Sequence, residues 1–332
     1  MSLPFKPSRR DLLKALPLIA AASGCRRPPY DRRAFVVPAR SAVALLPAPN
    51  YSVDLADVIF RGLQLLQPDV RGRSVFLKPN VVEYEAGTVI NTHALVVAGA
   101  AVALRRAGAR EVVVGEGPGH RRDIEYLLTA TGLYDQLKDL RLRFVDLNHD
   151  DVRIVSLKSR FTGLTELALP VELLAADFVV SVPKLKTHHW TGMTASMKNL
   201  FGVVPGAVYG WPKNLLHYRG IENSILDLTA TVQPHFAIVD AIVSMEGDGP
   251  IMGTPRATGF LAMGADPVSV DATCARVMGF EPSKMGYLQN ASGYLGNIAE
   301  ARIDQRGEPL SRYRTRFEVM QSFSGLQVAG GA

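Results

Sequence analysis

Cysteine is scarce in this chain of 332 residues, which contains only Cys25 and Cys274. Two thiols are too few for a disulfide framework, a zinc finger or a four-cysteine iron–sulfur cluster within one chain. The sequence also lacks a G-x-S-x-G nucleophile elbow, the Gly-Lys pair of a P-loop and an H-E-x-x-H metal motif. It therefore carries no familiar signature of an enzyme class, and it identifies no cofactor.

The net charge is also small when the N-terminal residues are left out of the count. The formal net charge is +6, but residues 1–25 hold four basic residues and one acidic residue, which leaves +3 for residues 26–332. A balance so near neutral over such a length gives no electrostatic basis for binding nucleic acid. Hydrophobic residues make up 47% of the chain, which is enough for a large buried core.

A paired-arginine motif stands near the N-terminus. Arg9 and Arg10 precede an apolar stretch over residues 15–24, which is far shorter than the roughly 20 residues that span a bilayer. The pattern is typical of a signal read by the twin-arginine translocase, which exports folded proteins. We therefore expect residues 1–25 to be a targeting segment, and the protein to work in the periplasm or cell envelope.

Two cleavage sites fit this signal. Residues 22–25 resemble the lipobox of bacterial lipoproteins, in which Cys25 would be acylated and would anchor the protein to a membrane. The three alanines at residues 20–22 would instead suit ordinary signal peptidase. We favour the lipoprotein, and an acylated Cys25 would leave Cys274 without an intramolecular partner.

The rest of the chain divides into a tether and a folded part. Residues 26–40 are rich in Arg and Pro and show no apolar period, which indicates a tether. From residue 41 onward, patterns typical of strands and helices alternate. This alternation predicts an α/β domain over residues 41–332, with a mostly parallel sheet flanked by helices, built as one elaborate domain or as two lobes.

Particular elements follow from the same patterns. Ser52 and Thr92 stand where helix N-caps are expected, and Asp266 precedes a proline that suits a first helical position. Strands are expected at residues 42–46, 74–77, 111–115, 177–182, 236–239 and 259–263, and helices at residues 53–67, 93–107 and 267–278.

A basic strip follows the strand at residues 177–182. Alternate side chains of an extended segment share a face, so Lys184, Lys186 and His188 should point together, while Thr187 and His189 should point away. Apolar residues then recur at helical spacing, which places a helix start near Thr191 and Gly192. Free N–H groups at such a start favour an anion.

The next helical turns add Lys198 and Asn199 to this strip. A strand end that leads into a helix start is where open α/β sheets bind ligands. We therefore expect an anion site whose contacts are Lys184, Lys186, Thr187, Lys198 and Asn199, with His188 as a catalytic candidate. The alternative is a solvated basic loop in which His189 or Trp190 packs inward.

Several runs resemble domain-of-unknown-function family 362. They are Leu-Lys-Pro-Asn at residues 77–80, Val-Pro-Lys-Leu-Lys-Thr-His at 182–188, Met-Lys-Asn-Leu-Phe-Gly at 197–202, Met-Glu-Gly-Asp-Gly-Pro at 245–250 and Asp-Pro-Val at 266–268, followed by Val-Asp-Ala at 270–272. The resemblance covers roughly residues 78–279, and it implies little chemistry because the family has no assigned activity. Some relatives are fused to a cysteine-rich iron–sulfur segment, whose cysteines this chain lacks.

An acidic group forms a second constellation. Asp240 follows the strand at residues 236–239, and Glu246 and Asp248 lie in a glycine-rich loop. Carboxylates there could act as a general base, hold ligand hydroxyls or bind a divalent cation together with His188 or His189. The alternative is a turn in which the loop only shapes the backbone. We expect the basic strip and this loop to face one cleft.

Two further loops are weaker candidates. Lys78 and Asn80 end a strand and place polar groups at the edge of the sheet. The loop at residues 115–120 could cradle a phosphate, but its glycines do not match a dinucleotide fingerprint and more simply turn a strand into a helix.

The sequence thus predicts an exported envelope protein that binds a small anionic molecule, with catalysis or a redox accessory role left open. A divalent-metal protein that uses His188 or His189 with Glu246 and Asp248 is one alternative. A noncatalytic module for a periplasmic partner is the other, and it would show a large exposed apolar patch without a deep pocket.

Overall fold

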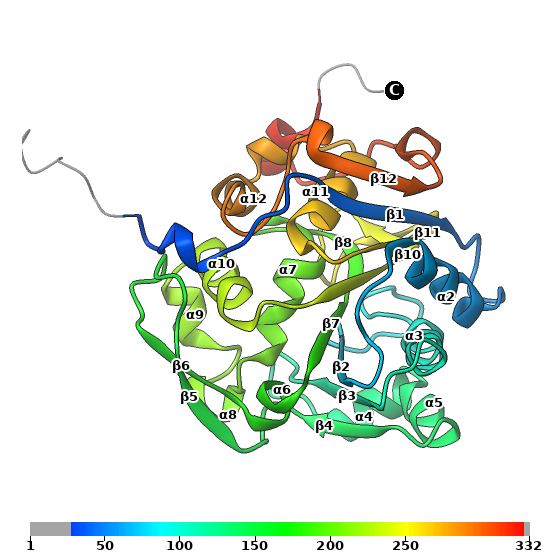
Figure 1. Cartoon of the computed structure of the whole chain (residues 1–332), viewed down its shortest axis with the longest axis vertical. Helices are drawn as coiled ribbons and strands as arrows, with labels where there is room; N and C mark the ends of the chain where they lie inside the picture. The colour runs from blue at the N-terminus through cyan, green and yellow to red at the C-terminus, as the bar shows by residue number, and fades with distance from the viewer. Residues whose placement is uncertain (1–27, 329–332) are drawn as a thin grey trace, which may run out of the picture.

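The computed structural model describes residues 28–328 (Figure 1). The predictions made for Arg9, Arg10 and Cys25 lie outside these residues. The α/β class with a mostly parallel sheet between layers of helices is confirmed.

One large sheet organises the chain, in the order β12-β1-β11-β10-β7-β2-β3-β4, and β8 pairs with β10 and with β9. A separate two-stranded sheet joins β5 to β6. The strands are β1 (Ser41–Pro47), β2 (Ser74–Pro79), β3 (Glu111–Glu116), β4 (Arg143–Asp146), β5 (Val152–Ser156), β6 (Glu166–Pro170), β7 (Phe178–Val182), β8 (Lys184–His188), β9 (Gly192–Thr194), β10 (Phe236–Glu246), β11 (Thr254–Gly264) and β12 (Ile303–Gly307).

Parallel pairing dominates this sheet. β4, β3, β2, β7 and β10 run parallel in a row, β8 runs parallel to β10, and β12 runs parallel to β1. β11 runs antiparallel to both of its neighbours, and β9 runs antiparallel to β8. Central strands covered on both faces are continuous apolar runs, as in the fully buried β7.

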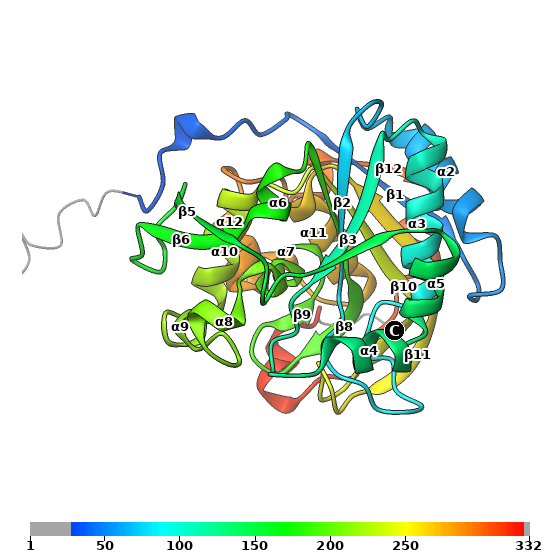
Figure 2. The ribbon, with the colours of Figure 1, turned by 90° about the horizontal axis from the view of Figure 1, so that it is seen from below.

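Helices cover both faces of the sheet. Figure 2 shows α2, α3 and α5 on one side and α7, α10 and α11 on the other. Each layer buries its own hydrophobic cluster against the sheet. The α-helices are α2 (Leu55–Leu66), α3 (Ala94–Arg106), α4 (Ile124–Ala130), α5 (Leu133–Asp139), α6 (Val171–Ala175), α7 (Ser196–Asn199), α8 (Gly206–Tyr209), α9 (Asn214–Tyr218), α10 (Ile221–Val232), α11 (Pro267–Val277) and α12 (Gly286–Ala291).

The segment predicted as a tether packs onto the domain over part of its described length. Tyr30 stacks on Tyr294 with ring centroids 3.8 Å apart, and buried Phe35 meets the same ring edge-on. A backbone bridge also joins Tyr30 to Ser159. Aromatic contacts therefore fix the chain onto the domain before β1 begins.

Helix caps match the prediction at one site and differ at two. Asp266 caps α11, and Pro267 occupies its first turn, as predicted. The α2 helix begins behind Asp54 rather than Ser52, because the Asp54 carboxylate accepts from the Asp57 N–H. The α3 helix begins behind His93 rather than Thr92, and the His93 ring accepts from the Leu95 N–H.

The helix start predicted near Thr191 and Gly192 is wrong. Gly192 begins strand β9, which forms a hairpin with β8 and pairs His188 with Gly192. The helix that follows, α7, begins only at Ser196 and spans four residues. Its first N–H groups, at Ser196 and Met197, donate to the buried Asp271 carboxylate. An internal carboxylate thus occupies the position where a bound anion was expected.

Two smaller features of the described chain bear on the predictions. Strand β10 continues to Glu246, so Asp240 lies within the strand and not at its end. No helix within residues 28–328 is long and apolar enough to cross a membrane.

Candidate functional site

The β8–β9 hairpin carries the basic strip, and the structure buries it. Lys184 and Lys186 are each 1% exposed and His188 is 4% exposed, so these residues do not decorate a solvated loop. Burying a charged amine is unfavourable unless a partner compensates it. The partners of each lysine therefore indicate whether its charge is compensated within the protein or is available to a ligand.

Lys184 is held in a closed ion pair. Its Nζ lies 2.6 Å from Asp240 Oδ2, in register across β8 and β10, and 2.8 Å from the Tyr51 hydroxyl. Asp240 also accepts from the His93 backbone N–H. Burial lowers the pKa of Lys184, while the charge of Asp240 opposes that shift. Both members are satisfied within the protein, so neither is free for a ligand.

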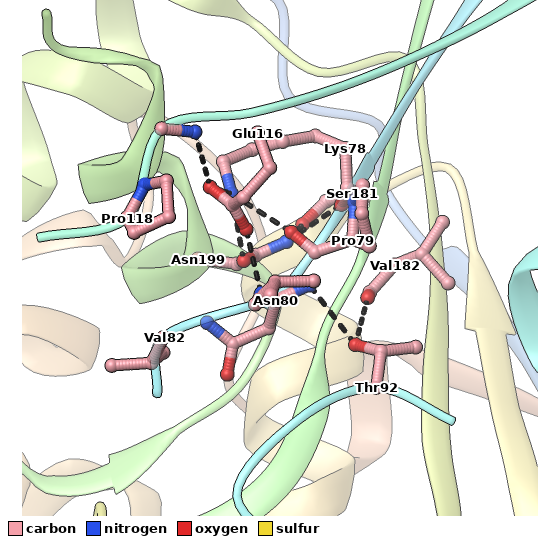
Figure 3. Close-up of polar contacts among 12 residues, drawn as sticks. Lys78, Pro79, Asn80, Val82, Thr92, Glu116, Pro118, Ser181, Val182 and Asn199 are labelled. Atoms are coloured by element: carbon pink, nitrogen blue, oxygen red, sulfur yellow. Dashed lines mark hydrogen bonds and ion pairs between the residues drawn. The ribbon is translucent and has the colours of Figure 1, made fainter. Parts of the chain in front are cut away.

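Lys78 forms a second closed pair, at the end of β2. Its Nζ lies 2.6 Å from Glu116 Oε1 and also donates to the Pro79 carbonyl (Figure 3). Glu116 accepts further from the backbone N–H groups of Val81 and Gly117. Burial lowers the pKa of Lys78, and Glu116 opposes it. This carboxylate therefore has its charge matched by Lys78, and both of its oxygens accept hydrogen bonds within the protein.

Asn199 links this pair to the sheet. Its side-chain oxygen accepts from Lys78 Nζ at 3.2 Å, and its side-chain nitrogen donates to the Lys78 carbonyl and to Ser181 Oγ (Figure 3). Every polar atom of the amide is in use. Asn199 therefore has a structural role, because it connects Lys78 of β2 to Ser181 of β7.

A pocket of about 180 Å³ opens beside the hairpin. Its basic lining comes from β8, from α7 and from the segment around α9, and its aromatic wall includes Trp190 and Phe201. The chemically active side chains that line it are Asn80, Glu116, His120, Lys186, His188, His189, Trp190, Thr194, Lys198, Asn199, Lys213 and His217.

Lys186 and Lys198 differ from the paired lysines. Lys186 Nζ donates to the Ile90 carbonyl at 2.7 Å, and Lys198 Nζ lies 4.9 Å from the centre of the Phe201 ring. Within residues 28–328, neither amine has a carboxylate within 4.0 Å. Burial and the nearby Lys198 hold the pKa of Lys186 well below its usual value. Burial, with the charge of Lys78, lowers the pKa of Lys198 to about 8.

His188 adds a neutral hydrogen-bond donor to this wall. Its Nδ1 accepts from the Trp190 backbone N–H at 3.1 Å, so the neutral ring carries its proton on Nε2. Burial, with the charge of Lys198, lowers the pKa of His188. Trp190 lies against His189 and His217 and is 57% exposed, which places a broad aromatic surface at the rim.

Lys213 and His217 enter the site from the segment around α9, and sequence reasoning missed them. Lys213 is buried and donates to Asn148 Oδ1 at 2.8 Å and to the Val204 carbonyl. Burial lowers its pKa to about 7. Lys213 stands two residues past Trp211 with a φ of 71°, in the left-handed region. No local motif marks this segment, so only the fold reveals it.

The acidic loop lies beside the basic strip, and its Pro250 and Ile251 line the same pocket, but the Glu246 and Asp248 side chains do not. The Glu246 carboxylate pairs with Arg256 at 2.5 Å and accepts a hydrogen bond from the Glu318 N–H. These contacts hold the C-terminal segment against β10, so this carboxylate is already engaged. Asp248 is about half-exposed, and one of its oxygens lies 3.6 Å from His189 Nδ1. Within the described residues, no group of three or more His, Cys, Asp or Glu side chains could hold a metal ion.

The remaining sequence candidates divide by position. The structure brings Lys186, His188, Lys198 and Asn80 to one pocket. Thr187 points away, and its buried hydroxyl lies near Gly249. Glu116 was missed as a site residue, although a carboxylate that ends the apolar strand β3 beside Lys78 of β2 was a usable signal.

This arrangement can do two things chemically. Three amines without a carboxylate partner in the described chain, those of Lys186, Lys198 and Lys213, and a ring that donates through Nε2 favour an anion. An amine that titrates near neutrality, as Lys198 does, can also accept or return a proton.

Comparison with known proteins places the chain among relatives. It is 29% identical over 224 residues to a thylakoid-associated protein of Synechocystis sp., and the match covers 64% of this chain. The chain spans 65% of the length of that relative, which is less than two thirds.

Two solved structures resemble the backbone. The lactate racemase apoprotein of Thermoanaerobacterium thermosaccharolyticum has 13% identity and a TM-score of 0.46, over 74% of this chain and 59% of that one. A structural-genomics target from Thermotoga maritima has 15% identity and a TM-score of 0.38, over 66% of this chain and 58% of that one.

A family model named domain of unknown function, DUF362, matches residues 75–276. This stretch is more than half of the chain. It contains β3, β7, β8 and β10, all but the first residue of β2, and the pocket-lining residues Lys186, His188 and Lys198. The chain therefore belongs to the DUF362 family.

Proposed function

We propose that this protein binds a small anionic molecule in the pocket beside the β8–β9 hairpin, with Lys186 and Lys198 holding the negative charge. One observation carries the proposal. Lys186, Lys198 and Lys213 line the pocket without a carboxylate partner in the described chain, and only Lys213 of the three has two oxygen partners. The neighbouring Lys78 and Lys184 are instead paired with Glu116 and Asp240.

The contrast matters because buried charges in proteins are normally paired. Lys213, the remaining buried lysine near the pocket, has an amide oxygen and a carbonyl as partners. Lys186 has one carbonyl, which leaves two of its three donor positions open. An anion would supply the missing partner and would raise the pKa of both pocket amines.

The nearby acid does not compete for these amines. Glu116 lines the pocket, but Lys78 and two backbone N–H groups already occupy its oxygens. Carboxylates of the acidic loop are also engaged or turned outward, as with Glu246 on Arg256. The positive potential of the pocket is therefore left for a ligand.

Calorimetric titration of the full-length chain with inorganic phosphate and with phenylacetate tests this proposal. Lys186→Met and Lys198→Met should each weaken binding about tenfold or more, because a charge-assisted hydrogen bond is lost. Lys138→Met, on the exposed face of α5, is the matched control and should bind as the wild type does. Equal affinity in all four proteins would overturn the assignment.

Acid–base catalysis on the bound anion is a second candidate. It is supported by a pKa of about 8 for Lys198 and about 7 for Lys213, since general bases work best near the operating pH. Lys198→Arg keeps the charge but does not titrate. It should retain binding and lose any solvent deuterium incorporation into the ligand observed by NMR, and retained incorporation would remove Lys198 as the base.

We also propose that the chain works at a membrane or in the cell envelope. The support is the paired-arginine motif with Cys25 in the sequence, together with the name of the Synechocystis relative, a thylakoid-associated protein. Replacing Arg9 and Arg10 with Lys should retain the protein in the cytoplasm on cell fractionation. Cys25→Ala should leave export intact but release the protein from membranes, and unchanged fractions in both variants would contradict the proposal.

A further inference from the structure

Asn80 is held rigidly at the edge of the pocket. Its backbone N–H donates to Thr92 Oγ1 at 3.0 Å, and its carbonyl accepts from the Thr92 N–H at 2.9 Å (Figure 3). The Thr92 hydroxyl donates in turn to the Val182 carbonyl at the end of β7. The loop after β2 is thereby fixed to the sheet at the point where the Asn80 side chain begins.

The Asn80 side chain itself is unused. Figure 3 shows its amide turned away from the Lys78–Glu116 pair, and within residues 28–328 its buried Oδ1 has no hydrogen-bond partner. The residue is 8% exposed and lines the pocket. Leaving a buried acceptor without a donor is unfavourable, and an acceptor that lines a pocket can gain its donor from a water or from a ligand.

Thr194 repeats this pattern from strand β9. Its hydroxyl is buried without a partner in the described chain, and the residue is 3% exposed in the same pocket. Thr194 is the cross-strand neighbour of Lys186 in the β8–β9 hairpin, which puts the two side chains on one face. Unfilled polar groups thus border the cationic wall from two different elements.

An amide oxygen can only accept a hydrogen bond. It repels the bare oxygens of an anion and attracts an O–H or N–H group. The pocket therefore favours a ligand with two properties, a negative charge near Lys186 and a hydrogen-bond donor near Asn80. A hydroxyl such as that of Thr194 can accept or donate, so it tolerates either group.

We propose that Asn80 selects anions that carry their own hydrogen-bond donor next to the charge, and this inference rests on the proposed anion-binding function. Two sources share this chemistry. Hydrogen phosphate keeps a P–OH group, whereas sulfate of the same shape has none. A 2-hydroxy acid such as mandelate keeps a hydroxyl that phenylacetate lacks.

Competitive calorimetry on the full-length chain at pH 7 distinguishes the sources. The wild type should bind the donor-bearing member of one pair about tenfold or more tightly than its donor-free partner. A preference confined to phosphate over sulfate identifies a phosphate-type ligand, and one confined to mandelate over phenylacetate identifies a hydroxy acid.

Variants assign this preference to particular atoms. Asn80→Ala removes the acceptor Oδ1 together with the Nδ2 donor, and it should reduce the preference to about onefold because the ligand's O–H or N–H group then has no acceptor there. Thr194→Val keeps the side-chain shape and should reduce the preference less. Asn290→Ala, on an exposed position of α12, is the matched control and should keep the full preference.

The outcomes separate the two proposals. Anion binding that depends on Lys186 but shows no preference in either pair overturns the selection by Asn80 and leaves the anion site intact. A preference that persists in a folded Asn80→Ala protein also overturns it. Absence of binding for all four anions overturns the proposed function itself.

Discussion

Two groups of lysines lie on the large sheet or on α7 beside it, and they differ in what neutralises them. Lys78 and Lys184 each meet a carboxylate at 2.6 Å, whereas Lys186 and Lys198 meet a carbonyl and an aromatic ring. The charges of the first group are compensated within the protein when the chain folds. The second is left incomplete beside a pocket, which is how a protein prepares a site at the expense of its own stability.

The largest change in stability is expected when a lysine that is paired with a carboxylate is removed. Lys184→Met should lower the free energy of unfolding by about 3–5 kcal/mol, because it leaves Asp240 buried without its cation. Urea denaturation followed by circular dichroism measures this loss. Lys184→Met combined with Asp240→Leu should recover much of it, and a loss below about 1 kcal/mol in the single variant would mean that the pair is not buried as described.

The opposite result is expected for an unpaired lysine. Lys186→Met should leave the free energy of unfolding unchanged or raise it by about 1 kcal/mol in ligand-free protein, because an uncompensated buried amine is replaced by an apolar side chain of similar volume. The same denaturation experiment applies. A loss as large as that of Lys184→Met would show that Lys186 is compensated inside the protein as fully as Lys184 is, and it would remove the contrast.

The contrast can be sharpened by varying pH. The pKa of Lys198 is about 8 in the folded protein against 10.5 as the ordinary value, so between these pH values the unfolded chain binds more protons than the folded one. Stability of the wild type relative to Lys198→Met should therefore rise as pH increases from about 8 to 10.5. Denaturation at several pH values checks this, and a flat or falling difference contradicts it.

Anion affinity should show the smallest effect in the same pH range. Protonated Lys198 attracts an anion and the neutral amine does not, so the affinity for phenylacetate, whose carboxylate stays ionised throughout this range, should be steady below about pH 8 and decline above it. Calorimetry across pH 6 to 10 measures the decline, and Lys198→Arg should remove it because arginine stays charged. An affinity that rises with pH would exclude Lys198 from the site.

The sequence was sufficient for the architecture and for half of the site. Alternating apolar patterns located β1, β2, β3, β7 and the Asp266 cap, and strand alternation put Lys186 and His188 on one face. The spacing of apolar residues predicted the wrong element after residue 190. Met193 and Met197 are four residues apart, as in a helix, but this spacing is equally compatible with a strand that leads into a short helix.

The rest of the site depends on contacts between distant segments. The pairing of β8 with β10 brings Asp240 to Lys184 and takes both out of the pocket, and no local pattern reveals that register. Lys213 reaches the pocket from a segment without a motif. Which buried lysines are neutralised is therefore a property of the fold, although their burial follows from their positions next to apolar strands.

The protonation of the two pocket amines tests the central claim most directly. NMR of the lysine side chains, assigned with Lys186→Met and Lys198→Met, follows each amine through a pH titration with and without inorganic phosphate. The account predicts that Lys198 titrates near pH 8 in the free protein and that phosphate moves both titrations upward. Ordinary lysine titrations that phosphate leaves unchanged would show that the amines are already neutralised and that no anion binds there.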